Sequence, residues 1–244
     1  MARIREYAEL APYYDLFFSH TKNYRAEANE LRRLIARYKR SNGNALLDVG
    51  CGTGRHLRYL KGWYRCTGTD LSKEMLDIAG RTVKGVRFRK ADMMHLKMSE
   101  RFDVITCLFS VIGYAKTYRN LDRAIRNFHD LLKPGGVLII DGWFDRREWR
   151  SGSVHVMKVD AGRTKIVKVG FSTRKGQFSR AEEHWIIAEE KKGIRYSVDR
   201  QEMGLFEKDR FLKILWARGF RARIMRSPMP GRPRYLAIRQ APPS

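Results

Sequence analysis

A glycine cluster and three spaced aspartates have the residue types of a site for a nucleoside-containing ligand. The glycines lie in Asp48-Val49-Gly50-Cys51-Gly52-Thr53-Gly54, directly after a short apolar run of strand length. Closely spaced glycines let the backbone turn sharply and approach a ligand that a side chain would exclude. Asp70 ends the next strand candidate, where a carboxylate can accept hydrogen bonds from two ribose hydroxyls.

Two later segments strengthen this interpretation. Asp92-Met93 follows a third strand candidate and offers a polar group and a soft side chain to the edge and face of an adenine ring. A fourth strand candidate ends in Leu108-Phe109-Ser110, where the rest of the ligand would lie. We therefore expect the ends of these strands to form one binding edge.

Alternating strands and helices must position these residues. Apolar runs of strand length end in Val49, Asp70, Lys90, Phe109 and Asp141, and helical patterns separate them. The helices are expected from about Arg55, after an N-cap at Ser72, and over Tyr118–Lys133, where Pro134-Gly135-Gly136 ends the pattern. This alternation predicts an α/β fold with a doubly wound, mostly parallel sheet.

The rest of the chain has a different pattern. Residues 3–40 have helical periodicity and are expected to form an N-terminal helical lid over residues 1–40. Residues 150–205 contain four antiparallel strand candidates and are expected to form a β-rich insertion on the substrate side. The cofactor-binding domain would then consist of residues 41–149 and 206–244, with a helix at 207–218 and two final strands.

Composition narrows the function classes. Lys and Arg number 50 against 26 Asp and Glu, a formal net charge of +24, which attracts anions such as nucleic acid or nucleotide-linked substrates. Three cysteines without metal-ligand spacing indicate neither a disulfide framework nor a metal site. No apolar run approaches the ~20 residues of a membrane span. We expect a cytoplasmic protein without membrane contact.

At these motifs the sequence resembles the class I S-adenosylmethionine-dependent methyltransferases. Further segments resemble the N,N-dimethyltransferases of nucleotide-linked aminodeoxysugars, and the likeness covers nearly the whole chain. These segments are Tyr14-Asp15-Leu16-Phe17, Lys22-Asn23-Tyr24, Phe109-Ser110-Val111-Ile112-Gly113-Tyr114, Trp143-Phe144 and Gly204-Leu205-Phe206. The resemblance implies S-adenosyl-L-methionine as the cofactor.

The resemblance also implies roles for individual residues. Tyr24 would close over the cofactor, Gly50 would contact its methionine part, Asp70 its ribose, and Asp92 with Met93 its adenine. The full set expected to bind the cofactor is Tyr24, Asp48, Gly50, Cys51, Gly52, Gly54, Asp70, Leu71, Asp92, Met93 and Leu108.

On the acceptor side the implied residues are Phe18, Trp143, Phe144, Arg174, Arg180 and Arg232. Two departures from the family pattern concern the acceptor. Phe18 stands where the relatives have Tyr, and Gly142-Trp143-Phe144 shortens their Pro-Trp-Trp-Phe stretch.

Methyl transfer to an amine needs orientation, exclusion of water and a neutral nitrogen. His184, Tyr14 and His20 are the candidate bases, and His184 and Tyr14 are the catalytic residues we expect. His184 stands among carboxylates in Glu182-Glu183-His184-Trp185. His56, His95 and His129 have no supporting context and are expected on the surface.

These expectations favour an N-methyltransferase that acts on a small amine, with a nucleotide-linked aminosugar as the leading acceptor. A methyltransferase acting on tRNA or rRNA is the alternative, because of the basic charge. This chain lacks the two signatures of the familiar nucleic-acid methyltransferases. Leu108-Phe109-Ser110-Val111 stands in place of Asn/Asp-Pro-Pro-Tyr, and Thr106-Cys107 stands in place of Pro-Cys. A non-catalytic cofactor-binding protein is a third reading. The expected partners are an anionic small molecule, with nucleic acid as the alternative, and a second copy in a homodimer.

Overall fold

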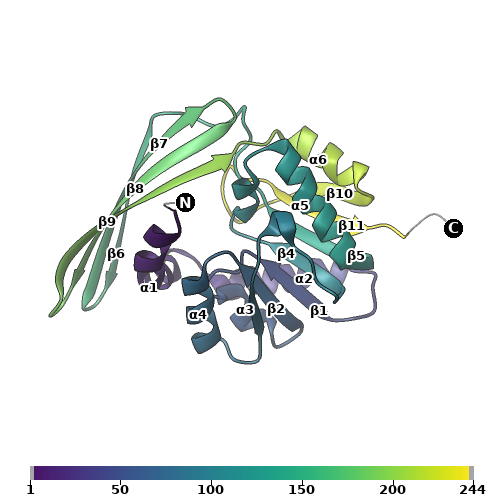
Figure 1. The fold of residues 1–244 in the computed structure, drawn as a ribbon, viewed down its shortest axis with the longest axis horizontal. Coiled ribbons are helices and arrows are strands. Elements are labelled where there is room, and N and C mark those ends of the chain that lie inside the picture. Colours follow the sequence, from purple (N-terminus) through teal and green to yellow (C-terminus); the bar gives the residue numbers. More distant parts are fainter. Residues whose placement is uncertain (1–2, 242–244) are drawn as a thin grey trace.

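The main sheet has the architecture that the alternating pattern predicts. The computed structural model describes residues 3–241, with side chains from Leu10 onward (Figure 1). The strand order is β10-β11-β5-β4-β1-β2-β3. Their bounds are β1 Ala45–Val49, β2 Arg65–Asp70, β3 Arg87–Lys90, β4 Phe102–Cys107, β5 Leu132–Asp141, β10 Phe220–Met225 and β11 Arg234–Arg239. The strands β1 to β5 pair in parallel, and β11 and β10 continue the sheet antiparallel. This confirms the predicted fold class.

Helices cover both faces of this sheet. The bounds are α1 Arg3–Thr21, α2 Tyr24–Tyr38, α3 Arg55–Leu60, α4 Lys73–Thr82, α5 Tyr118–Leu131 and α6 Lys208–Ala217, with short 3-10 turns η1 Met93–His95 and η2 Val111–Ala115. One apolar core joins α5 and α6 to the sheet, and another joins α2 and α3 to the opposite face. Figure 1 shows α5 and α6 on the same side. None of the helices in the described part of the chain is long and apolar enough to cross a membrane.

The late segment forms a separate antiparallel sheet in the order β6-β7-β8-β9. Its strands are β6 Ser153–Ala161, β7 Thr164–Lys175, β8 Phe178–Glu189 and β9 Gly193–Gly204. Figure 1 shows it as a long twisted sheet beside the main domain, with α1 next to it. Because side chains alternate along a strand, this sheet has an inner face toward α1 and an outer face toward solvent.

Helix α1 is held against the inner face by an aromatic contact. Phe17 is fully buried, and its ring meets the ring of Trp185 at 4.9 Å in an edge-on arrangement. Leu10 and Tyr13 pack in the same apolar cluster, with Val159 and other residues of the sheet. The lid and the insertion therefore form one packed unit.

Three element boundaries differ from the sequence-based expectation, each for a local reason. The N-terminal helical region divides because Asn23 caps α2, its Oδ1 accepting a hydrogen bond from the Ala26 N–H at 3.0 Å. The fourth strand ends at Cys107, since Phe109 and Ser110 have positive φ. Helix α5 ends at Leu131, two residues early, and β5 begins immediately.

The segment Pro134-Gly135-Gly136, which the sequence predicts to end the helix, belongs to β5. Leu132 already pairs with Phe102, and the register shifts before Val104 pairs with Val137. Gly135 has a φ of +74°, and its carbonyl accepts the N–H of Arg40 at 2.8 Å. The Pro-Gly-Gly segment therefore does bend the backbone, but it does so as an irregularity inside a strand.

The Phe17 contact predicts how strongly the lid is docked. We expect Phe17→Ala to lower the free energy of unfolding by about 3–5 kcal/mol, because it leaves a cavity between α1 and the sheet. Urea denaturation measures this loss. Phe171→Ala, on the exposed outer face of the same sheet, is the matched control and should change stability by less than about 0.5 kcal/mol. Equal losses in both variants would contradict the docking role.

Candidate functional site

A large cavity lies between the carboxyl ends of the central strands, helix α1 and the inner face of the insertion. Its volume is about 1160 Å³. It brings together most of the residues that the sequence singled out, namely Tyr14, Phe18, Tyr24, Asp48, Gly50, Cys51, Gly52, Asp70, Leu71, Met93, Leu108, Trp143, Phe144 and Arg232. This is the edge at which open α/β sheets bind ligands.

The glycine loop needs its glycines for two different reasons. A Cβ on Gly50 would lie 2.4 Å from a methyl of Val111, so a side chain has no room there. Gly52 has a φ of +53°, and a Cβ built on it would meet no atom within 4 Å. The loop is therefore packed against Val111 at Gly50 and open at Gly52.

Asp70 ties this loop to the next helix. Its Oδ2 accepts the Gly52 N–H at 2.8 Å, and its Oδ1 accepts the Ser72 N–H at 2.9 Å. Ser72 in turn caps α4, as predicted, by accepting the N–H of Met75. Burial raises the pKa of Asp70, and the backbone hydrogen bonds oppose that rise. The carboxylate keeps further lone pairs that a ligand can use.

Asp48 is a second buried acid in the cavity wall. Its Oδ1 accepts a hydrogen bond from Thr106 Oγ1 at 2.8 Å. Burial raises the pKa of Asp48 to about 6. The side chain thus carries most of its charge only near and above neutral pH.

A chain of polar contacts that the sequence did not reveal supports the cofactor side. Glu27 accepts from His56 at 2.8 Å and pairs with Lys22 at 3.1 Å, and all three residues line the cavity. The prediction that His56 lies on the surface is wrong: the residue is buried, with the Tyr24 ring 5.0 Å away. His56 lies on the buried face of α3, and the helical spacing of this face was the pattern that could have predicted its burial.

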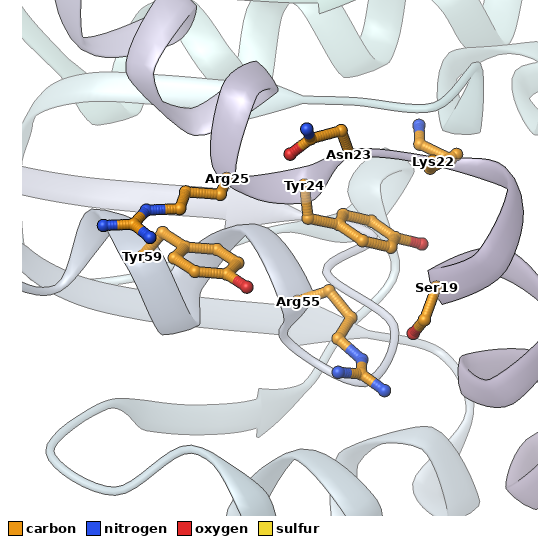
Figure 2. A pocket seen from close by; sticks show the side chains of 7 residues that line it. All are labelled: Ser19, Lys22, Asn23, Tyr24, Arg25, Arg55 and Tyr59. Carbon is orange, nitrogen blue, oxygen red and sulfur yellow. The ribbon is translucent and has the colours of Figure 1, made fainter.

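A smaller pocket of about 320 Å³ opens beside this chain of contacts (Figure 2). It shares Lys22, Asn23, Tyr24 and Arg55 with the large cavity. Arg55 is ion-paired with Asp15 of α1 at 3.0 Å, so the lid is anchored to the start of α3. Residues at the start of α2 therefore contribute to both pockets.

Two aromatic rings lie beside the partly buried guanidinium of Arg232 in the cavity wall. Arg232 lies 4.3 Å from the ring centre of Trp143 and 5.1 Å from that of Phe144. Burial lowers its pKa to about 10, so the group stays charged at neutral pH. Among the described residues no carboxylate forms an ion pair with it, and Asp141 is ion-paired with Arg234 at 2.6 Å. A partly buried cation without an ion-pair partner attracts an anionic group.

Five of the expected site residues lie outside the cavity. Gly54 caps α3 in a left-handed conformation, and a Cβ on it would meet Phe88. Asp92 caps η1 by accepting the Met94 N–H at 2.8 Å, while the neighbouring Met93 lines the cavity. Both residues shape the ends of elements, which argues against the direct cofactor contacts expected of them.

The other three residues belong to the insertion. Arg180 lies on the outer face, paired with Glu202 at 2.9 Å. Arg174 is exposed at the end of β7 and donates to backbone carbonyls. His184 also lies on the outer face, where it contacts Glu182 at 2.9 Å and Tyr196. The residues of β8 that line the cavity are its neighbours at odd positions, Ser179 to Trp185. This placement argues against a role for His184 as the base.

The other candidate bases are also constrained. Loss of hydration raises the pKa of Tyr14 well above its usual value, so its hydroxyl remains protonated and suits hydrogen bonding better than proton abstraction. Its ring contacts Phe18 at 4.5 Å. His20 lies on the exposed side of α1, with Nδ1 2.8 Å from the Leu16 carbonyl oxygen. His95 and His129 lie outside the cavity lining.

The inner face of the insertion supplies polar residues that sequence analysis missed. His155, Lys168, Glu183 and Asp199 all line the cavity. The pattern that could have found them is the alternation of buried and exposed positions along β8, which places Glu183 inward and His184 outward. A shift of one residue in this alternation would exchange Glu183 and His184 between the two faces.

The raised pKa of Asp48 predicts a pH-dependent cost of ionisation. The pKa of Asp48 is about 6 in the folded state, above the ordinary 3.8. The protonated side chain therefore contributes to the free energy of unfolding below pH 4, and this contribution is lost as the pH rises through 6. We expect Asp48→Asn, which keeps an acceptor for Thr106, to raise the free energy of unfolding at pH 7.5 by about 1–3 kcal/mol, with no gain near pH 4. Urea denaturation at both values checks this. A less stable variant at pH 7.5 would contradict it.

Comparisons with known proteins agree with this geometry. Residues 46–136, which contain the glycine loop and the first strands, match the family described as a methyltransferase domain. The dTDP-3-amino-3,6-dideoxy-alpha-D-glucopyranose N,N-dimethyltransferase of Streptomyces fradiae is 32% identical over 94% of this chain and 91% of its own.

Solved structures extend the similarity to the insertion. The Streptomyces venezuelae protein DesVI has a TM-score of 0.88 and 29% identity, over 93% of this chain and 96% of its own. CalS10, an amino pentose methyltransferase of Micromonospora echinaspora with bound S-adenosylmethionine, has a TM-score of 0.84 and 28% identity, over 93% and 96% of the two chains. The chain therefore belongs to the family of the dTDP-aminodeoxysugar N,N-dimethyltransferases and is an S-adenosylmethionine-dependent methyltransferase.

Proposed function

We propose that this enzyme methylates the amino group of a nucleotide-linked aminosugar. The observation that carries the proposal is the partly buried, positively charged Arg232 in the same cavity as the glycine loop. A nucleotide-linked sugar contains a diphosphate, and a guanidinium binds phosphate through paired, charge-assisted hydrogen bonds. The names of the relatives support the same substrate class.

The residues around the glycine loop fit S-adenosylmethionine. That cofactor supplies a methyl group on a sulfonium. We propose that the open backbone at Gly52 accommodates it, that Asp70 accepts hydrogen bonds from its ribose, and that Met93 packs on its adenine. The other residues proposed to contact it are Tyr24, Asp48, Gly50, Cys51, Leu71 and Leu108, which line the same part of the wall.

On the acceptor side we propose that Trp143 and Phe144 form an apolar floor under the sugar, with Phe18 and Tyr14 above it. These rings exclude water from the reacting nitrogen, which strengthens the electrostatic interactions inside. The Trp143 indole is fixed by donating to Ser179 Oγ at 2.8 Å. The floor is therefore held between the main domain and the insertion.

The alternative of an RNA methyltransferase has no support among the full-length relatives, which are sugar N-methyltransferases. Neither a nucleic-acid partner nor a homodimer gains support from them. The three cysteines are free and buried, which favours a reducing compartment, and we propose a cytoplasmic location on this ground.

A screen with isotope-labelled cofactor tests the proposed function. It compares dTDP-3-amino-3,6-dideoxyglucose, the free aminosugar and total RNA as methyl acceptors. We expect transfer to the nucleotide-linked sugar, weaker transfer to the free sugar and none to RNA. Labelling of RNA without labelling of the sugar would overturn the proposal.

The contacts of Asp70 predict its effect on cofactor binding. We expect Asp70→Ala to weaken binding of S-adenosylhomocysteine by about 1–3 kcal/mol, because the ribose loses a charged acceptor and Gly52 loses its anchor. Calorimetry measures the change. Asp77→Ala, an exposed acid on α4 that pairs with Lys73, is the control. If both variants kept wild-type affinity, Asp70 would not hold the ribose.

Arg232 should distinguish the nucleotide-linked acceptor from the free sugar. We expect Arg232→Gln to raise KM for the nucleotide-linked acceptor by about 10- to 100-fold, since a charge-assisted contact contributes about 1.5–3 kcal/mol. The rate with the free sugar should change little. Arg226→Gln removes the same charge from an exposed position outside the cavity lining, and so controls for long-range steering. Equal effects in the two variants would place the phosphate elsewhere.

A further inference from the structure

One row of residues crosses the inner face of the insertion and presents polar side chains to the cavity. The strand registers align His155 of β6 with Gly170 of β7, Glu183 of β8 and Asp199 of β9. His155, Glu183 and Asp199 line the cavity. Strand neighbours in register share a face, so these groups belong to one wall.

Within this row, His155 reaches across a strand to Glu183. Its Nε2 lies 3.2 Å from Glu183 Oε1, although the two residues belong to strands that are not neighbours. An ionised carboxylate only accepts hydrogen bonds, so Nε2 donates and the lone pair of the neutral ring is on Nδ1. The contact fixes both the orientation and the tautomer of the imidazole.

Gly170 makes this reach possible. A Cβ on Gly170 would lie 2.3 Å from both Cε1 and Nε2 of His155, and 3.1 Å from Glu183 Oε2. Its φ is not in the left-handed region, so the glycine is needed for space and not for backbone conformation. The imidazole lies directly over the strand between its own and that of Glu183.

Lys168 fixes the other oxygen of the carboxylate. Its Nζ lies 2.8 Å from Glu183 Oε2, in an ion pair that does not have hydrogen-bond geometry. The ammonium also lies 5.5 Å from the ring centre of Phe17 and 5.6 Å from that of Trp185. The glutamate is thus held from both sides, between a cation and an imidazole.

The reaction requires that the acceptor nitrogen lose a proton before it attacks the methyl group. A sugar amine is mostly protonated at neutral pH, and an ammonium has no lone pair with which to attack a methyl group. With His184 on the outer face and Tyr14 protonated, the cavity wall offers His155 in their place. We propose that His155 is the general base for the acceptor amine and that Glu183, set by Lys168 and the gap at Gly170, is its positioning residue.

The inference rests on the proposed aminosugar acceptor. In the proposed step, one N–H bond of the acceptor ammonium breaks and its proton goes to Nδ1 of His155, which becomes an imidazolium. The electron pair of that bond stays on nitrogen as the nucleophilic lone pair. The imidazolium then loses its proton to solvent before the next cycle. Each methyl transfer releases one proton, so two methylations require the base twice.

The charged and titratable groups that share this part of the cavity with His155 come from three strands and from α1. They are Lys168 on β7, Glu183 on β8, Asp199 on β9 and Tyr14 on α1. Gln201 donates to Asp199 Oδ2 at 2.5 Å, which holds that acid in the row. Two acids and one lysine of the insertion line the cavity, a balance that favours a positively charged amine.

The test compares wild type with His155→Gln, using dTDP-3-amino-3,6-dideoxyglucose from pH 6 to 10. We expect kcat of the variant to fall about 10²- to 10⁴-fold at pH 7 and to recover about tenfold per pH unit as the amine loses its proton in solution. Added imidazole should restore part of the rate to His155→Ala. Gly170→Ala should lower kcat in the same direction by displacing the ring.

Two controls separate catalysis from folding and binding. His184→Gln removes a histidine that also contacts a carboxylate, on the outer face next to Glu183 in sequence, and should keep the wild-type profile. Calorimetry with S-adenosylhomocysteine present should show that His155→Gln binds the acceptor within about threefold of wild type. A base acts on the proton, whereas a sugar-binding residue would change affinity.

The proposal is overturned if His155→Gln keeps the wild-type kcat and pH profile, or if it loses acceptor affinity while the pH profile of kcat stays unchanged. The second result would make His155 a binding residue. A wild-type enzyme that methylates no nucleotide-linked aminosugar would instead contradict the proposed function on which this inference rests. The wild-type measurement therefore distinguishes the two failures.

Discussion

The site depends on one partly buried carboxylate that accepts hydrogen bonds from two segments. Asp70 accepts the N–H of Gly52 from the glycine loop and the N–H of Ser72 from the start of α4. Without these donors a nearly buried charge would be costly, and with them the loop after β1 and the end of β2 have a fixed separation. In the same loop Val111 packs closely against Gly50, whereas the space at Gly52 stays open.

The inner face of the insertion forms the second wall of the cavity and combines an apolar contact with paired charges. The insertion has an apolar anchor, where Phe17 meets Trp185, and beside it a polar row in which each charge has a partner. The anchor holds α1 against the sheet, and Asp15 of the same helix pairs with Arg55 at the start of α3. Helix α1 thus connects the insertion to the glycine loop, so a change in the lid reaches both walls.

The sequence was sufficient for the main sheet and for the cofactor side because both depend on local patterns. Apolar runs that end in Val49 and Asp70 predict parallel strands, and the glycines from Gly50 to Gly54 predict the turn. Asp92 and Gly54 were assigned to the ligand, although their groups serve to cap η1 and α3. Both motifs lie at the cavity as predicted, but Asp92 in one and Gly54 in the other shape the start of a helical element.

The acceptor side was harder to predict because it depends on register and on distant pairing. Glu182-Glu183-His184-Trp185 contains two possible faces, and the choice is set by the packing of Trp185 against Phe17, a residue more than 160 positions away. That packing turns Glu183 inward and His184 outward. No local signal connects His155 with Glu183, since their contact crosses a third strand at Gly170.

The charges of the cavity come from different parts of the fold. Arg232 lies beside the rings of Trp143 and Phe144, whereas the acids Glu183 and Asp199 belong to the insertion. A substrate with a phosphate at one end and an ammonium at the other matches both groups in a single orientation, so the charge separation itself would direct the amine toward the insertion.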